Sequence, residues 1–173
     1  MLNEKRIKEA ESNISKYLEE GLLKKTKDDI ALHIFIKNAK DSLRASKLLL
    51  DNKIPLWTIV SSYYSMFYMT NSVLLTLGYK TGESIVHKVT ADALIALVRN
   101  KLKDQILDDY ETIKEEAFSI AEIKSDELVE TFDFERKKRN LIQYKTPLDN
   151  ISKKAETSLE RAKEFVFELE KLL

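Results

Sequence analysis

The chain has 173 residues, of which 43% are hydrophobic and 34% charged, a balance typical of one folded domain with a well-solvated surface. Its 29 basic residues equal its 29 acidic residues, which excludes a general basic coat for nucleic acid. Cysteine is absent, so disulfides and thiolate chemistry are excluded as well. With three glycines and two prolines, the sequence offers too few turns for an all-β fold.

Apolar residues recur every three or four positions, the helical period, in successive stretches along the chain. The predicted helices span residues 4–20, 30–50, 57–77, 83–97, 104–123, 125–144 and 151–173. The third stretch is the most apolar and is expected at the centre, although its many hydroxyl groups make it too polar for a membrane span. We therefore predict an all-α, antiparallel up-and-down bundle of four to five core helices, at residues 28–173, preceded by an N-terminal helical arm and connector at residues 1–27.

Metal and cofactor sites are not expected. The two histidines, His33 and His87, lie in different predicted helices, and neither has a second ligand at metal-binding spacing. No glycine-rich phosphate loop or nucleophile elbow occurs. The first residues lack the apolar core of a signal peptide, so we expect a cytoplasmic protein without membrane contact.

Two segments carry residues that suit a binding site. The aromatic run at residues 63–68 either offers a stacking platform for bases or fills the bundle core with one tyrosine hydroxyl turned toward a cleft. In the predicted helix at 125–144, Arg136 and Arg139 fall on the same helical stripe as Leu128 and Phe132. This stripe is either a solvated basic face near a helix end or a polar face that is covered by a partner.

The order and spacing of four features resemble the HEPN family, in particular its short stand-alone prokaryotic members. The features are an early helix ending in leucines at 39–50, the run at 62–68 followed by Leu77-Gly78-Tyr79, His87 after that turn, and Arg136-Lys137-Lys138-Arg139-Asn140 with Tyr144 before a long last helix. The resemblance implies a helical bundle that forms a homodimer. It also implies a nucleotidyltransferase as antitoxin partner, because family members are often encoded with one.

The family signature is an arginine, a polar residue and a histidine four to six positions after the arginine. In catalytic members these residues cut RNA without metal, in a cleft between two protomers. Arg139 and Asn140 match the first two positions, but Tyr144 stands where the histidine would be. Since tyrosine has a reference pKa of about 10, it is a poor general base near neutral pH. The resemblance thus assigns Arg139, Asn140 and Tyr144 to the site without establishing catalysis.

Three functions follow as alternatives. The first is a dimeric module that binds a nucleotide, an RNA phosphate or a nucleotidyltransferase partner. In it, Arg136, Arg139 and Lys145 hold phosphate, and Tyr64 and His87 line the cleft. The second is a metal-independent endoribonuclease toxin, and the third is a helical adaptor without a ligand.

Overall fold

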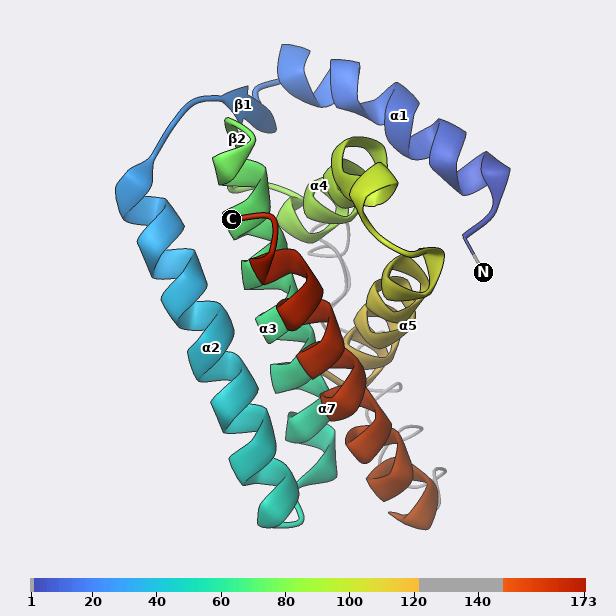
Figure 1. Cartoon of the computed structure of the whole chain (residues 1–173). Helices are drawn as coiled ribbons and strands as arrows, with labels where there is room; N and C mark the ends of the chain where they lie inside the picture. Colours follow the sequence, from blue (N-terminus) through green and yellow to red (C-terminus); the bar gives the residue numbers. More distant parts are fainter. Residues whose placement is uncertain (1, 122–147) are drawn as a thin grey trace, which may run out of the picture.

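The computed structural model describes residues 2–121 and 148–173, and every structural statement below concerns these residues. Helices dominate, and one pair of very short strands joins them (Figure 1). In chain order, the elements are α1 (Glu4–Glu19), β1 (Leu23–Lys25), α2 (Asp29–Asp51), α3 (Pro55–Thr76), β2 (Tyr79–Thr81), α4 (Val86–Ala93), the π-helical turn η1 (Leu94–Val98), the 3₁₀ turn η2 (Arg99–Lys101), α5 (Asp104–Ala121) and α7 (Leu148–Glu170).

Four long helices form the body of the bundle. Helices α2 and α5 run in one direction and α3 and α7 in the other, with α3 packed most extensively against α2 and α7 (Figure 1). Helix α1 crosses one end of this bundle and contacts α4 and η1. The predicted all-α antiparallel bundle, with the segment around residues 57–77 at its centre, is confirmed.

Helix α3 lies at the centre of the bundle because nearly all of its sides carry residues that can be buried. Fifteen of its 22 residues are buried, including many with hydroxyl or amide groups. Several of these polar groups bond to their own helix: Thr70 donates to the Met66 carbonyl at 2.9 Å, and Asn71 to the Phe67 carbonyl at 2.9 Å. These hydrogen bonds satisfy the groups that form them although they are buried, which avoids the cost of an orphaned polar atom. Among the described helices, none is long and apolar enough to cross a membrane.

The small sheet is a feature that the periodicity does not predict. In the connector after α1, residues 23–25 pair antiparallel with residues 79–81. Gly78 makes the second strand accessible, because its φ of +84° lets the chain turn sharply after α3. Leu23 is completely buried and packs with Tyr17 and Val89, so the strand pair fastens the end of α1 to the bundle.

The segment predicted as one helix at 83–97 is also organised differently. Helix α4 starts only at Val86, because Ile85 before it takes a left-handed backbone with φ of +43°. That conformation is strained for a β-branched residue and interrupts the helix. After Ala93 the chain widens into the π-helical turn η1 and then tightens into η2. Helix α4 is thus a short element with unusual backbone on both sides.

Candidate functional site at the two ends of helix α4

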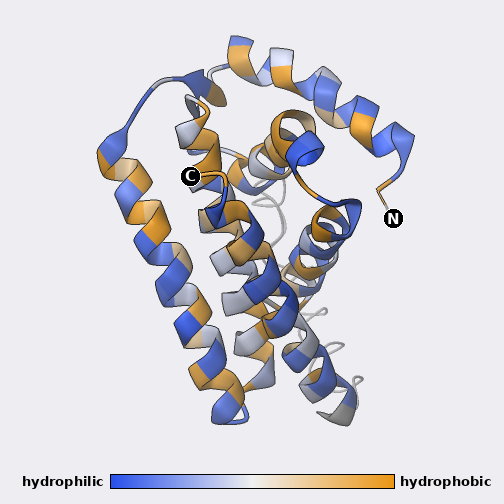
Figure 2. Ribbon diagram, in the orientation of Figure 1, coloured by the Kyte–Doolittle hydropathy of each residue, from blue (hydrophilic) through white to orange (hydrophobic). Residues whose placement is uncertain are grey.

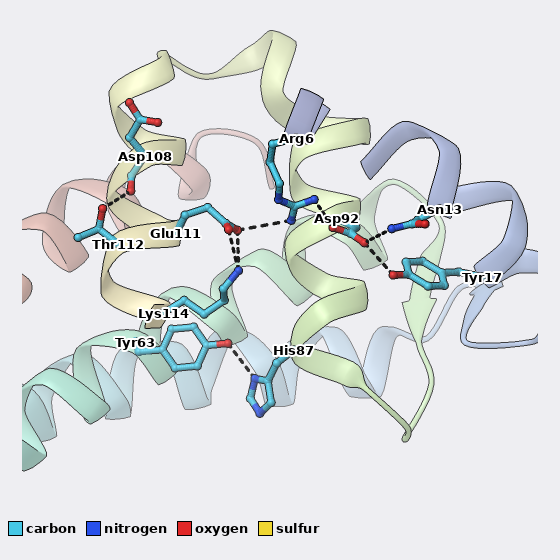
Figure 3. Close-up of polar contacts among 10 residues, drawn as sticks. All are labelled: Arg6, Asn13, Tyr17, Tyr63, His87, Asp92, Asp108, Glu111, Thr112 and Lys114. Carbon is cyan, nitrogen blue, oxygen red and sulfur yellow. Dashed lines mark hydrogen bonds and ion pairs between the residues drawn. The ribbon is translucent and has the colours of Figure 1, made fainter. Parts of the chain in front are cut away.

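The C-terminal end of α4 carries a buried carboxylate that is held by α1. The side chain of Asp92 is 1% exposed, and its Oδ1 lies 2.6 Å from a guanidinium nitrogen of Arg6. Its Oδ2 accepts hydrogen bonds from the Asn13 amide at 2.9 Å and the Tyr17 hydroxyl at 2.7 Å. Figure 3 shows these three side chains converging on Asp92 from one helix. A buried charge is tolerated when it is paired and hydrogen-bonded, and both oxygens of Asp92 meet that condition.

This cluster extends toward α5, and its contacts raise the pKa of one of its members, Tyr17. Arg6 also approaches Glu111 at 3.8 Å, and Glu111 pairs with Lys114 at 2.8 Å (Figure 3). Burial, together with the hydrogen bond to Asp92 and the charge of that carboxylate, raises the pKa of Tyr17. We call Arg6, Asn13, Tyr17 and Asp92 the Asp92 clamp. It is satisfied within itself, so its evident role is to fix α1 to α4.

The N-terminal end of α4 carries His87, which lies among aromatic rings. The Tyr63 hydroxyl and the His87 Nδ1 are 2.8 Å apart (Figure 3). The nearest ring is Phe67, with its centroid 4.6 Å from that of His87, followed by Phe118 at 5.2 Å, Tyr63 at 5.6 Å and Tyr64 at 5.9 Å. Three helices, α3, α4 and α5, therefore build this site around one imidazole.

The contact with Tyr63 sets the chemistry of the imidazole. Tyr63 is completely buried, and burial raises its pKa far above the usual value, so its hydroxyl keeps its proton. A protonated hydroxyl can donate to an imidazole nitrogen or accept from its N–H, and in either case the hydrogen bond restrains the ring of His87. Tyr63 thus orients His87.

The rings near this site form two layers. Tyr63, Tyr110 and Phe165 are completely buried in the core, where the ring centroid of Tyr110 lies 6.0 Å from that of Tyr63 and 5.3 Å from that of Phe165. A second set is only half-buried and is linked by ring contacts from α2 through α3 and α4 to α5. This outer ring row consists of Phe35, Tyr68, Tyr64, His87 and Phe118. Within the run at 63–68, all residues except Tyr64 and Tyr68 are buried in the core, and the stacking platform for bases stays a prediction.

The structure places the sequence-predicted residues unevenly. Tyr64 and His87 lie side by side, both half-buried, and burial raises the pKa of Tyr64, with Tyr68 adding to the effect. Their role in a cleft stays a prediction. The other predicted site residues lie outside the described part of the chain: Arg136, Arg139, Asn140, Tyr144 and Lys145.

Sequence reasoning missed Tyr63, Phe118 and Asp92 as members of these sites. Tyr63 directly precedes Tyr64 but faces the core, and it contacts His87 through both its hydroxyl and its ring. Asp92 had one usable signal: it is an acidic residue on a helix whose neighbours Thr90, Ala91 and Ala93 are all small and buried. A charge in such surroundings needs a partner from elsewhere in the chain.

No group of three or more metal-ligating side chains comes together among residues 2–121 and 148–173. Comparison with known families gives one match: the HEPN domain family matches residues 32–172. Comparisons with curated proteins and with solved structures give no match. The family match covers the whole bundle from α2 to α7 and leaves out α1, the helix that the Asp92 clamp holds. Because it spans more than half of the sequence, the chain belongs to the HEPN domain family.

Proposed function

We propose that this HEPN protein is a dimeric module that binds the phosphate of a nucleotide or of RNA, with Arg139 as the principal phosphate ligand. The observation that carries the proposal is His87, a half-buried imidazole oriented by Tyr63 and flanked by Tyr64. Membership in the HEPN family points to nucleotide- or RNA-related function. An imidazole that is held in one orientation and left partly accessible beside a tyrosine is better suited to contacting a polar ligand than to a purely structural role in the core.

The charge pattern supports phosphate binding rather than a broad nucleic-acid surface. The chain has zero formal net charge, so attraction to phosphate must come from a local group of cations. Arg136, Arg139 and Lys145 supply such a group in the sequence. Arginine suits this role because its planar guanidinium can donate two parallel hydrogen bonds to phosphate oxygens. In a symmetric dimer, two copies of Arg139 would repel one another unless an anion lay between them.

A second candidate is a metal-independent ribonuclease, and His87 is the observation that favours it. Cleavage requires that the 2′-oxygen attack phosphorus and lose its proton, while the bond to the 5′-oxygen breaks and that oxygen gains a proton. Tyr144 is a poor base for this step near neutral pH. A free imidazole has a reference pKa of about 6.5 and exchanges protons near neutral pH. In this alternative, His87 supplies the proton transfer that the motif at Arg139 lacks.

The proposal includes a protein partner of the nucleotidyltransferase class, with the pair acting as toxin and antitoxin. It is tested by searching the native genome for a neighbouring nucleotidyltransferase gene, co-expressing its product with this chain, and measuring whether the two co-purify as one species. Failure to co-purify, with both proteins folded, would leave the phosphate-binding proposal standing and remove the partner from it.

The central experiment compares wild type with Arg139→Ala, Tyr144→His and His87→Gln. Binding of a labelled RNA oligomer is measured by fluorescence anisotropy, cleavage by gel electrophoresis in the presence of EDTA, and oligomeric state by light scattering. We expect a dimer in every case, RNA binding that is lost in Arg139→Ala, and no cleavage by wild type.

The outcomes separate the candidates. Cleavage by wild type that disappears in His87→Gln would establish the ribonuclease and the role of His87. Cleavage that appears only in Tyr144→His would show a phosphate site whose proton-transferring group is absent. If all four proteins fold and none binds RNA or nucleotide, the phosphate-binding function is wrong and the adaptor alternative remains.

A further inference from the structure

Helix α2 lies at the edge of the bundle and leaves much of its apolar surface uncovered. Only Ala39 and Ser46 among its 23 residues are buried, whereas α3 buries fifteen of 22. It packs mainly against α3, and hydrophobic stretches recur along its length in Figure 2. Three of its large aliphatic side chains are exposed: Ile30 at 76%, Ile34 at 49% and Leu48 at 57%. Exposed apolar surface that is gathered on one element marks a contact with another protein.

The three exposed aliphatic residues belong to one line along α2. This line, which we call the α2 seam, follows steps of four, four, three, four and three residues through Ile30, Ile34, Asn38, Asp41, Ala45 and Leu48. At 100° per residue, its members fall within an arc of about 80°. Such spacing is typical of a helix that packs lengthwise against a second helix. All six residues are exposed or half-buried, so the core leaves the line accessible.

The α2 seam is complementary to itself when two copies run antiparallel. The spacing of its middle residues, 34, 38, 41 and 45, is the same in both directions, so a twofold axis can pass beside the midpoint of residues 39 and 40. Ile34 then faces Ala45 of the second copy, which joins a large side chain to a small one. At each end, Ile30 meets Leu48 of the second copy.

The middle of the seam is polar and selects the antiparallel arrangement. There the Asn38 amide faces Asp41 of the second copy, and the twofold axis forms this pair twice. Lys37 and Arg44 hold the Asp41 carboxylate at 2.7 and 3.3 Å, which leaves it lone pairs for a further donor. In a parallel pair, each Asp41 would instead face the other Asp41, and like charges would repel one another. A single polar layer of this kind fixes the register of paired helices.

We propose that the α2 seam is a contact between two copies of this chain, which pair antiparallel along about 27 Å of helix. The contact goes beyond the proposed function, because it is separate from the dimer contact at Arg139 and needs neither phosphate nor RNA. Three exposed aliphatic side chains per copy make a small apolar interface. The contact is therefore weak and joins the proposed dimers into larger assemblies as the concentration rises.

The register is tested with single cysteines, because the chain has none of its own. Ile34→Cys and Ala45→Cys are made as separate variants, so every disulfide must join two chains. Residue 34 lies opposite residue 45 in the proposed pair, whereas the two copies of either residue are about 16 Å apart along the helices. A disulfide cannot span that distance. Under mild oxidation, we expect the mixture of the two variants to cross-link and each variant alone to stay uncross-linked.

The strength of the contact is measured by sedimentation velocity over a concentration series. Ile34→Glu places a carboxylate in the apolar part of the seam, so the second association step should weaken at least about tenfold. His33→Glu is the matched control, because His33 is exposed on the same helix, next to Ile34, but lies outside the seam. This control should associate as wild type does. Circular dichroism and urea unfolding show that each variant is folded.

Contrary outcomes are distinct. If Ile34→Glu leaves the association of wild type unchanged, or if His33→Glu weakens it equally, the α2 seam is not the contact. If Ile34→Cys alone cross-links as readily as the mixture, the antiparallel register is wrong.

RNA binding by Ile34→Glu separates this contact from the proposed function. Unchanged RNA binding, with the second association step lost, would support both proposals. If Ile34→Glu removes the dimer itself, the α2 seam is the dimer contact and the one proposed at Arg139 is wrong. If wild type is a monomer throughout, both contacts fail, and RNA binding alone decides on the phosphate site.

Discussion

Helix α4 has only eight residues, and its two ends hold their polar side chains in different ways. At its C-terminal end, Asp92 is almost completely buried and both of its oxygens are bound by side chains of α1. At its N-terminal end, His87 keeps partial exposure and is surrounded mainly by rings. The first arrangement is closed and serves to hold α1 and α4 together, whereas the second places an imidazole among aromatic rings with part of its surface accessible.

The contrast teaches how a short helix can position a titratable side chain. Helix α4 starts after the strained Ile85 and ends in a π-helical turn, so its own backbone offers little support. The Asp92 clamp supplies an external anchor only about one and a half turns from His87. A helix that lies outside the family match thus stabilises the element that carries the candidate site. Substitutions that break the Asp92 clamp should therefore lower the stability of the fold, whereas substitutions at or beside His87 should change the chemistry of its imidazole.

The largest effect is expected from Asp92→Ala. Removing the carboxylate leaves Arg6, Asn13 and Tyr17 without their shared acceptor. Breaking a buried ion pair by removing one partner costs about 3–5 kcal/mol. Because Arg6 is 22% exposed and can recover some hydration, we expect a loss of about 3 kcal/mol, measured by urea unfolding.

A control is available in a more exposed ion pair of the same helix α1. Arg99 of η2 contacts Glu11 of α1 at 2.7 Å, but the two side chains are 26% and 48% exposed. Exposed ion pairs contribute about 0–1 kcal/mol, so Arg99→Ala should cost about 0.5 kcal/mol or less. Equal losses in the two variants would show that burial of Asp92 contributes nothing, and the clamp would then be an ordinary surface contact.

Much of the fold could be predicted from the sequence because helical periodicity is a local signal. The helices at α2, α3 and α7 follow from apolar residues at three- and four-residue steps, and Gly78 marks the turn after α3. The strand pair could not be predicted this way, since each strand has three residues and its partner is distant in the chain. The left-handed backbone at Ile85 also has no local signal, because β-branched residues normally avoid it.

The candidate site was harder to predict, because its residues are joined only by the fold. The resemblance selected Tyr64 and His87, and the structure brings their rings within 5.9 Å. The helical spacing of Tyr63 predicts a core residue. Its ring does lie in the core, yet its hydroxyl reaches His87. Asp92 is one acidic residue among many, and only the arrival of α1 explains why it is buried.

A smaller, pH-dependent effect is expected from Tyr17→Phe. At neutral pH the variant loses one hydrogen bond to a carboxylate that Asn13 still binds, so we expect a loss of about 1.5 kcal/mol. The pKa of Tyr17 is raised in the folded protein, so its contribution is complete below the unfolded pKa of about 10 and declines as the pH rises above that value.

The stability difference between wild type and Tyr17→Phe should therefore shrink as urea unfolding is repeated from pH 8 to above about pH 10. Wild type and the variant share Tyr63 and Tyr110, whose pKa values are also raised, so comparing the two proteins isolates Tyr17. A difference that stays constant with pH would contradict a protonated Tyr17 bound to Asp92.

The smallest effect on stability, and the most specific one, is expected from Tyr63→Phe. The variant keeps the ring in the core and removes only the hydroxyl that is hydrogen-bonded to Nδ1 of His87, so the loss should be about 1 kcal/mol. The chemical effect is larger, because the hydroxyl of Tyr63 then no longer restrains Nδ1. In wild type, two-dimensional ¹H–¹⁵N spectra above the imidazole pKa should show one dominant tautomer of neutral His87, with the shifts of its two ring nitrogens far apart. In Tyr63→Phe, the two nitrogen shifts should move toward one another as both tautomers become populated.

His33 serves as the internal reference, because it lies exposed on α2 and contacts a backbone carbonyl of its own helix. Unchanged nitrogen shifts at His87 would mean that Tyr63 does not select the tautomer, and the comparison between the two ends of α4 would then lose its chemical half.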